Sequence, residues 1–504
     1  MGALYNARYN MVMSRLFSQF AALRLSSVQV FFLSLAYYVS LYFSINNRSF
    51  LIFTCLYVIL LWWRLRSLEL VFFLSLIATM PFAKGWAYEI VLLPWQQIQQ
   101  WALFPIVYFF PVYIASAFLF LSFYLYIRKH RGRSAAVRLP TLPLVVFTGF
   151  IFWSLVGSVG SPFPSVSILS VIQLIELFIL LCLPSLLFDR SDKLSSYVIG
   201  IVAATLIYES GWAIAQWLHG GPLGRDIEVY LPGNQFGIGS SENFSLLRVT
   251  GTFFDPSILG TFLVMQMIIF LQLLLHKRMY KTGRYLLGLL IVMGSVALIF
   301  TGSRVIYGIW FISVIVLSWS KRRDVVRAIH LVMRQHWLLL VGCVSLVAAY
   351  ISPYVISRVS SLSNVFTEYG SATYRIQMVI YAARLVMSRP LIGGGVSQSP
   401  YYYATAFIGE KLRFDPTYPH NLFAQLSIET GLIGALLFAA FLIIVFRRAF
   451  RAKVINEFAL AAGAFTLCAM FYPIFINRQE IISYLFLYIG LYYATTRRNL
   501  PRAK

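Results

Sequence analysis

The stretch TYPHNLFAQLSIETGLIGALLF, residues 417–438, joins a polar beginning to a long apolar run. His420 and Asn421 come first, and the apolar sequence behind them carries one carboxylate, Glu429, about two helical turns inside. An apolar run of this length predicts a membrane-spanning helix. A carboxylate at that depth is costly unless it is paired, so we expect Glu429 to face the protein interior or a wet cavity.

Apolar runs recur along the whole chain. Of its 504 residues, 60% are hydrophobic and 12% are charged, which excludes a soluble globular protein. The sequence predicts an all-α, polytopic transmembrane helical bundle that forms a single membrane domain over residues 1–504, with no cleaved signal peptide. We expect about 14 spans, at 28–45, 49–63, 68–82, 101–126, 142–160, 168–188, 194–218, 250–275, 285–301, 304–320, 337–356, 421–446, 458–474 and 481–496.

Positive charge is distributed unevenly along these spans. The chain carries 41 Lys and Arg against 17 Asp and Glu, a net charge of +24. Such a balance points to nucleic acid in a soluble protein, whereas in a membrane protein cytoplasmic loops collect Lys and Arg. With a cytoplasmic N-terminus, runs such as RKHRGRSAAVR and HKRMYKTGR all fall on the inner side. We therefore predict that both termini are cytoplasmic and that the chain binds no nucleic acid.

The longest outer segment in this topology is residues 357–420. Within it, residues 371–389 place apolar side chains at helical spacing and arginines, among them Arg375, on the polar positions. This pattern predicts an amphipathic helix on the outer membrane surface. Pro390 is expected to end the helix, and the glycines at 393–395 predict a flexible turn behind it.

Four segments in the second half of the chain resemble one known family. They are GTFFDPSILGTFL (251–263), TGSRVIYGIWF (301–311), YRIQMVIYAARLVMSRPLIGGG (374–395) and YPHNLFAQLSIETGLIGALLF (418–438). In their order and spacing they resemble the O-antigen ligase and Wzy-type O-antigen polymerase superfamily, over roughly residues 250–440. The resemblance implies glycosyl transfer from a polyprenyl-diphosphate-linked glycan at the outer face of the bacterial cytoplasmic membrane.

The same resemblance implies that Arg304, Arg375 and His420 are the functional trio, since they occupy the matching positions of three motifs. The predicted topology independently places all three outside. Arginine suits a diphosphate leaving group because its planar fork binds phosphate in a bidentate manner and stays charged. Arg304 follows TGS at the expected start of a helix, and Arg375 lies on the polar face of the surface helix. Contacts with lipid headgroups are the alternative for both arginines.

Three further residues support this predicted site. His420 could accept a proton from the acceptor hydroxyl or hydrogen-bond a phosphate, and the sequence leaves both open. Asn421 is a candidate helix N-cap and is grouped with the two arginines as substrate-binding. Glu429 is expected to have a structural partner, an arginine or a backbone N–H, rather than to touch His420. Asp255 is expected to cap the helix before Pro256 or to orient an arginine.

The predicted activity is that of a glycosyltransferase without metal or cofactor. No Asp-x-Asp motif occurs, so cationic side chains would do what a divalent ion does in other enzymes. The leading interpretation is polymerisation of lipid-linked repeat units into O-antigen or exopolysaccharide. A ligase that moves finished glycan to lipid A-core or protein is the nearest alternative, and a flippase is disfavoured because the cations gather at one face. Expected partners are the polyprenyl-diphosphate-linked donor and acceptor, the lipid bilayer and a chain-length regulator.

Overall fold

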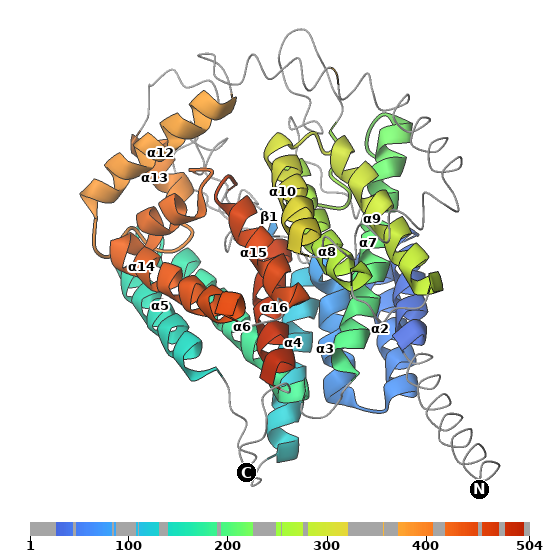
Figure 1. The fold of residues 1–504 in the computed structure, drawn as a ribbon. Helices are drawn as coiled ribbons and strands as arrows, with labels where there is room; N and C mark the ends of the chain where they lie inside the picture. The colour runs from blue at the N-terminus through green and yellow to red at the C-terminus, as the bar shows by residue number, and fades with distance from the viewer. Residues whose placement is uncertain are drawn as a thin grey trace, which may run out of the picture.

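The computed structural model describes residues 27–43, 47–82, 85–86, 107–108, 110–130, 140–188, 193–224, 248–253, 255–275, 281–320, 356, 371–406, 419–451, 456–472 and 479–497. These residues form a helical bundle (Figure 1). An apolar helix at Ser27–Tyr42 precedes α2 (Asn47–Leu65), α3 (Leu68–Thr79), α4 (Phe110–His130), α5 (Thr141–Val159), α6 (Pro164–Phe188), α7 (Leu194–His219), α8 (Pro256–Leu274), α9 (Lys281–Phe300) and α10 (Arg304–Ser320). Then follow α12 (Ser371–Ser388), α13 (Ser399–Ala406), α14 (Leu422–Arg451), α15 (Glu457–Ala469) and α16 (Gln479–Arg497).

The structure confirms the predicted polytopic, all-helical fold class. Within the described residues, seven helices are long and apolar enough to cross a membrane, and five shorter apolar helices accompany them. Every predicted span overlaps a described helix, except that 337–356 lies outside the described residues apart from Ile356. A short 3-10 turn, Met80–Phe82, and two two-residue strands, β1 (Gly85–Trp86) and β2 (Val107–Tyr108), are the small additions. The span count and the cytoplasmic termini stay predictions.

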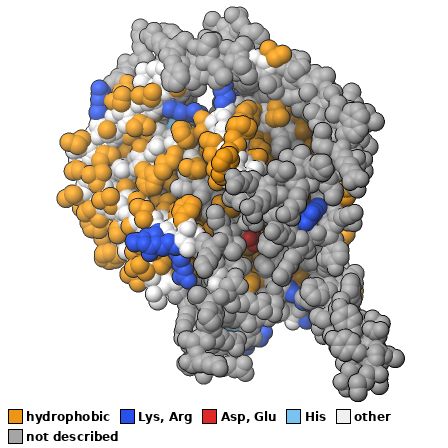
Figure 2. Space-filling view, viewed as in Figure 1, with side chains coloured by type: hydrophobic (Ala, Val, Ile, Leu, Met, Phe, Trp, Pro, Cys, Tyr) orange, Lys and Arg blue, Asp and Glu red, His pale blue; other side chains and the backbone are white. Residues whose placement is uncertain are grey.

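The bundle has two groups of helices joined through α15 and α16 (Figure 1). On one side α8 packs against α9, α10 and α15, and it is buried along nearly its whole length. On the other side α5, α6 and α14 pack together, and α16 packs against α6. Figure 2 shows hydrophobic side chains over the face where α5, α12 and α14 lie, as expected of a surface that meets lipid.

The helix of the opening stretch is broken in its middle. At Gly431 the backbone of α14 takes φ 67° and ψ 179°, a conformation that only glycine adopts readily. The break would leave backbone groups unpaired at membrane depth, where each is costly. The chain behind α12 pairs with them: Gly394 N–H donates to Ile428 O and Gly395 N–H to Glu429 O, both at 2.8 Å, and Leu432 N–H donates to Pro390 O at 2.8 Å.

This pairing corrects the prediction of a flexible glycine turn. Residues 393–400 are buried, because the turn docks into the break in α14 instead of lying in solvent. A Cβ on Gly393 would meet Gly431 N at 2.3 Å, and a Cβ on Gly431 would meet Leu391 O at 2.1 Å. The glycines serve close backbone crossing rather than mobility. The predicted surface helix is present as α12, and its Met378 and Ala382 pack with Tyr403 and Ile428.

We expect Gly431→Ala to destabilise the protein by about 3 kcal/mol or more, since the new methyl group clashes with Leu391 O in a glycine-only conformation. Gly288→Ala in α9 is the matched control, because nothing lies within 4 Å of its Cβ position. Thermal unfolding in detergent is the measurement. Equal melting temperatures for Gly431→Ala and the unmodified protein would contradict the crossing.

Candidate functional site

His420 lies just before α14 begins, on the N-terminal side of the break at Gly431. Its backbone is left-handed, with φ 51°, which histidine tolerates better than most side chains. The ring meets Tyr374 of α12 edge to face, with 5.7 Å between centroids. Its Nδ1 atom is buried and has no hydrogen-bond partner among the described residues. A buried imidazole nitrogen without a partner has the capacity to accept or donate a proton to a ligand.

Asn421 fixes this end of α14. Its Oδ1 accepts from the N–H groups of Phe423 and Ala424, each at 3.0 Å, so the predicted N-cap is present. Its Nδ2 donates to Met470 O at 3.0 Å, which ties the start of α14 to the end of α15. Both ends of the amide are therefore engaged in holding the backbone next to His420, and contact of Asn421 with substrate stays a prediction.

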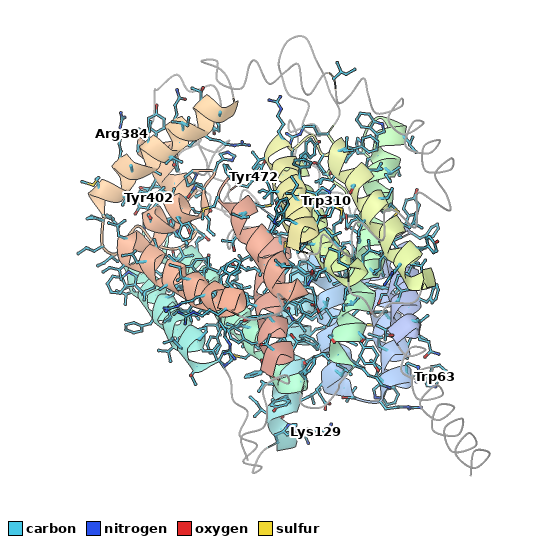
Figure 3. All side chains as sticks on the ribbon, in the orientation of Figure 1. Trp63, Lys129, Trp310, Arg384, Tyr402 and Tyr472 are labelled. Carbon is cyan, nitrogen blue, oxygen red and sulfur yellow. The ribbon has the colours of Figure 1, made fainter. Side chains whose placement is uncertain are left out.

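Tyr472, just after α15, links the two predicted arginine motifs. The Arg375 guanidinium carbon lies 5.1 Å from the centre of the Tyr472 ring, within the range of a cation–π contact. The Tyr472 hydroxyl is 2.6 Å from Ser303 Oγ, and Ser303 directly precedes Arg304. Tyr472 is buried, and Figure 3 shows it between the ends of α15 and α10. Nothing in the sequence marked Tyr472 as part of a site, since an aromatic residue after an apolar run is ordinary in membrane proteins.

Arg304 begins α10, as predicted, directly after a turn in which Gly302 has φ 64°. The side chain is partly buried. A second arginine, which the sequence analysis missed, reaches the same turn: Arg248 Nε donates to Thr301 O at 2.9 Å. In the sequence, the available signal for Arg248 was its position just before the GTFFDPS segment at 251–257. Helix N-termini favour anions, so two arginines at this end of α10 make an electropositive entrance to the helix.

Polar residues of α7 hold the segment that carries Arg248. Glu209 accepts from Thr252 N–H at 2.9 Å and from Thr252 Oγ1 at 2.6 Å. Gln216 Oε1 accepts from the N–H groups of Thr250 and Gly251, at 3.1 and 2.9 Å. Asp255 then caps α8, because its Oδ1 accepts from Ser257 N–H at 2.6 Å and Pro256 takes the first helical position. The cap expected of Asp255 is thus present.

Charge around His420 is dominated by burial and by Arg375. Burial first, and then the charge of Arg375, lower the pKa of His420 from 6.5 to about 4, against the opposing effect of Asp255. Burial and the charge of Arg375 both disfavour the protonated, positively charged imidazole. The imidazole is therefore neutral near neutral pH, with a lone pair available to accept a proton.

Glu429 lies inside the protein, as expected, and not beside His420. It is 1% exposed, and its Oε1 accepts from Ser399 Oγ at 2.8 Å and from Gln425 Nε2 at 3.1 Å. Backbone groups of Ser397 and Ser399 also hydrogen-bond the carboxylate, so the backbone partner expected from the sequence is present beside a hydroxyl and an amide. Ser399 begins α13 behind the docked turn, so Glu429 joins that turn to α14. Within the described part of the chain, no group of three His, Cys, Asp or Glu side chains gathers as metal ligands would.

Residues 288–439 match the model of the family described as O-antigen ligase. The matched segment is about 30% of the chain, and over it the chain is similar to the O-antigen ligase and polymerase superfamily. The match includes Arg304, Arg375, His420 and Glu429 and leaves Asp255 outside. It confirms the resemblance drawn from the motifs.

A curated relative agrees over a shorter stretch. It is a Rickettsia conorii protein that carries the provisional name polysaccharide ligase, 33% identical over 73 residues. The aligned part is 14% of this chain and 18% of the relative, so the chain matches less than a fifth of the relative's length. The two matches support a ligase or polymerase type of role on glycans in a membrane setting.

The neutral state of His420 can be tested directly. In protein with 13C-labelled histidine in nanodiscs, we expect the His420 signal, assigned by its loss in His420→Gln, to stay that of neutral imidazole from about pH 8 down to about pH 5. An ordinary histidine would gain its proton over that interval, near pH 6.5. A His420 signal that gains its proton near pH 6.5, as an ordinary histidine does, would contradict its burial beside Arg375.

Proposed function

We propose that the chain transfers a glycan from a polyprenyl-diphosphate carrier to a sugar hydroxyl, as a polymerase of lipid-linked repeat units. The observation that carries the proposal is the link from Arg375 through Tyr472 to Ser303, beside Arg304, with His420 at the same end of the bundle. Arginines for a diphosphate and a neutral base for a hydroxyl are the two things that this chemistry needs. The match of residues 288–439 to the O-antigen ligase family supports the same reaction class.

In the proposed step the acceptor hydroxyl oxygen attacks the anomeric carbon of the donor glycan. The new C–O bond forms as the bond to the diphosphate oxygen breaks, and the electron pair leaves with the diphosphate. Arg304 and Arg375 hold this group and stabilise its growing charge. The hydroxyl proton passes to His420. A single displacement inverts the configuration at the anomeric carbon.

The charge balance around His420 fits this order of events. Without a ligand, burial and Arg375 keep the imidazole neutral. A bound diphosphate would offset the charge of Arg375, and the pKa of His420 would then rise toward values useful in proton transfer. The alternative role of His420, hydrogen-bonding the phosphate, fits the same position beside Arg375. In that case the acceptor hydroxyl loses its proton to another group.

Ligation of finished glycan is the second candidate function. The matched family and the Rickettsia conorii relative are both described by that activity. The same trio would hold the same donor, and only the acceptor would differ: lipid A-core or a protein instead of a second lipid-linked unit. The proposed location is the outer side of the bacterial cytoplasmic membrane, with the bilayer and a chain-length regulator as further proposed partners. We propose a reaction without metal or cofactor.

Glycan analysis of a strain that lacks this protein tests both candidates. We expect single lipid-linked repeat units to accumulate in the null strain and in strains that carry His420→Ala or Arg304→Lys at normal membrane levels. Losing the base or the bidentate fork costs about a hundredfold in rate. Full-length polymer that remains on its lipid carrier would instead identify the ligase.

Arg384→Ala provides the matched control for Arg375→Ala. Both arginines belong to α12, but Arg384 is exposed and lies over Tyr381, 5.5 Å from the ring centre, away from Tyr472. Arg375→Ala should abolish the long glycan and Arg384→Ala should preserve it. Normal glycan with His420→Ala would contradict the role given to His420.

Tyr472 is expected to act as a positioning residue for Arg375 and the start of α10. Tyr472→Leu removes both the ring under Arg375 and the bond to Ser303, and a loss of about tenfold in transfer rate is expected from the cation–π contact alone. Tyr472→Phe keeps the ring and should lose less. Rates from a reconstituted assay with lipid-linked glycan, together with melting temperatures of both variants, separate positioning from a loss of folding. Equal transfer rates for Tyr472→Leu and Tyr472→Phe would contradict this positioning role.

A further inference from the structure

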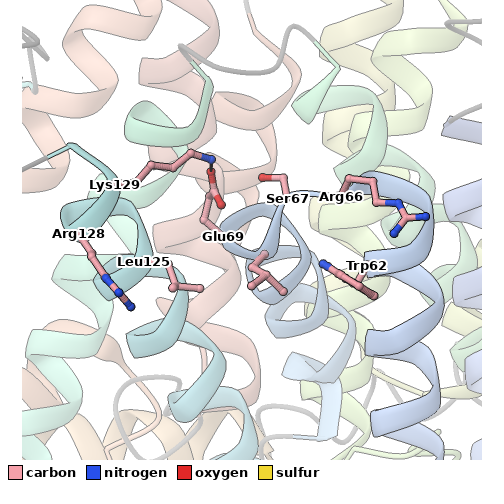
Figure 4. A pocket seen from close by; sticks show the side chains of 8 residues that line it. Trp62, Arg66, Ser67, Glu69, Leu125, Arg128 and Lys129 are labelled. Atoms are coloured by element: carbon pink, nitrogen blue, oxygen red, sulfur yellow. Dashed lines mark hydrogen bonds and ion pairs between the residues drawn. The ribbon is translucent and has the colours of Figure 1, made fainter.

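A polar pocket lies at the other end of the bundle from the candidate site. Figure 3 shows Lys129 and Trp63 near that end, whereas Tyr472 and Arg384 lie toward the opposite one. The pocket is a cavity of about 440 Å³ between the end of α2, the start of α3 and the end of α4. Its lining includes Trp62, Arg66, Glu69, Leu125, Arg128 and Lys129 (Figure 4).

The pocket carries an excess of positive charge. Glu69 is the one carboxylate in the lining, and it is buried and paired with Lys129, whose Nζ lies 2.5 Å from Glu69 Oε1. Arg66 and Arg128 stand on opposite flanks of that pair, and no further carboxylate of the lining balances them (Figure 4). An anion that enters the pocket would therefore meet two arginines.

An aromatic ring positions one of the two arginines at the pocket. Arg66 has a left-handed φ of 56° in the short connection from α2 to α3, and its guanidinium lies over the Trp62 ring, 5.3 Å from the centre. The ring holds this arginine at the pocket edge. The pocket meets the N-terminus of α3, where the Glu69 carboxylate is hydrogen-bonded by the Ser67 side chain and by its own backbone N–H. The attraction for a further anion therefore comes from the two arginines.

The surroundings of the pocket are apolar. Leading away from it, α2 and α4 expose large hydrophobic side chains, namely Leu56, Ile59, Leu60 and Trp63 on α2 and Leu121, Tyr124 and Ile127 on α4. A free phosphate or a soluble nucleotide makes no use of such flanks. A phospholipid matches both parts, because its headgroup is anionic and its acyl chains need an apolar surface.

We propose that this pocket binds the phosphate headgroup of an anionic phospholipid, with the acyl chains along the exposed sides of α2 and α4. The positive-inside rule predicts that this end faces the cytoplasm, where the leaflet is negatively charged. The site is separate from His420 and the arginines near it, and it does not depend on glycan transfer.

Lipid binding by the purified full-length protein tests the proposal. Native mass spectrometry would be run with added phosphatidylglycerol, with phosphatidylcholine, and with glycerol 3-phosphate or inorganic phosphate as competitors. We expect retained phosphatidylglycerol, little phosphatidylcholine and no displacement by the soluble phosphates at millimolar concentration. The double variant Arg66→Gln/Arg128→Gln should bind phosphatidylglycerol at least about tenfold more weakly.

The matched control is Arg447→Gln/Arg451→Gln, which removes two exposed arginines near the end of α14 that do not line the pocket. It should retain phosphatidylglycerol like the unmodified protein. Equal loss in both double variants would mean general attraction to basic surface and would overturn the site. Unchanged binding in Arg66→Gln/Arg128→Gln would overturn it too. Displacement by glycerol 3-phosphate or inorganic phosphate would overturn the lipid and assign a free phosphate instead.

Discussion

The backbone crossing between Gly431 and the turn at 393–395 is the constraint on which the candidate site depends. Helix α12 carries Arg375, and α14 begins beside His420. The chain that follows α12 is fixed to the middle of α14 by three backbone hydrogen bonds around the break. Neither glycine of the crossing has space for a Cβ. The relative position of Arg375 and His420 therefore follows from a close approach of two backbones, rather than from the side chains that would do the chemistry.

Buried or half-buried polar side chains support irregular backbone at three places in this apolar bundle. Glu429 joins the docked turn to α14, Glu209 and Gln216 hold the segment after Arg248, and Asn421 caps α14 and reaches Met470. Inside a membrane, non-helical backbone is tolerated only where protein groups or water satisfy it. These side chains therefore shape the loops that present His420, Arg375 and Arg304, and they have no role in the proposed transfer step itself.

Much of this could be predicted from the sequence because its signals are local. Apolar runs predicted nearly every described helix, helical spacing in residues 371–389 predicted α12, and Asn421 and Asp255 were expected as caps. The ordered motifs predicted the superfamily. Each of these inferences rests on neighbours within a few turns, where side-chain type decides the backbone conformation.

The remaining features depend on contacts between distant segments. The glycines at 393–395 predicted a flexible turn. In the structure this turn instead forms backbone hydrogen bonds to the break in α14. Only the folded chain brings these unpaired backbone groups together. Tyr472 and Arg248 gave little signal, because their partners Arg375, Ser303 and Thr301 lie in other helices. The sequence by itself determined a membrane bundle and the residue types of its candidate site. The tertiary structure alone decided which backbones cross, and thereby which of those residues meet.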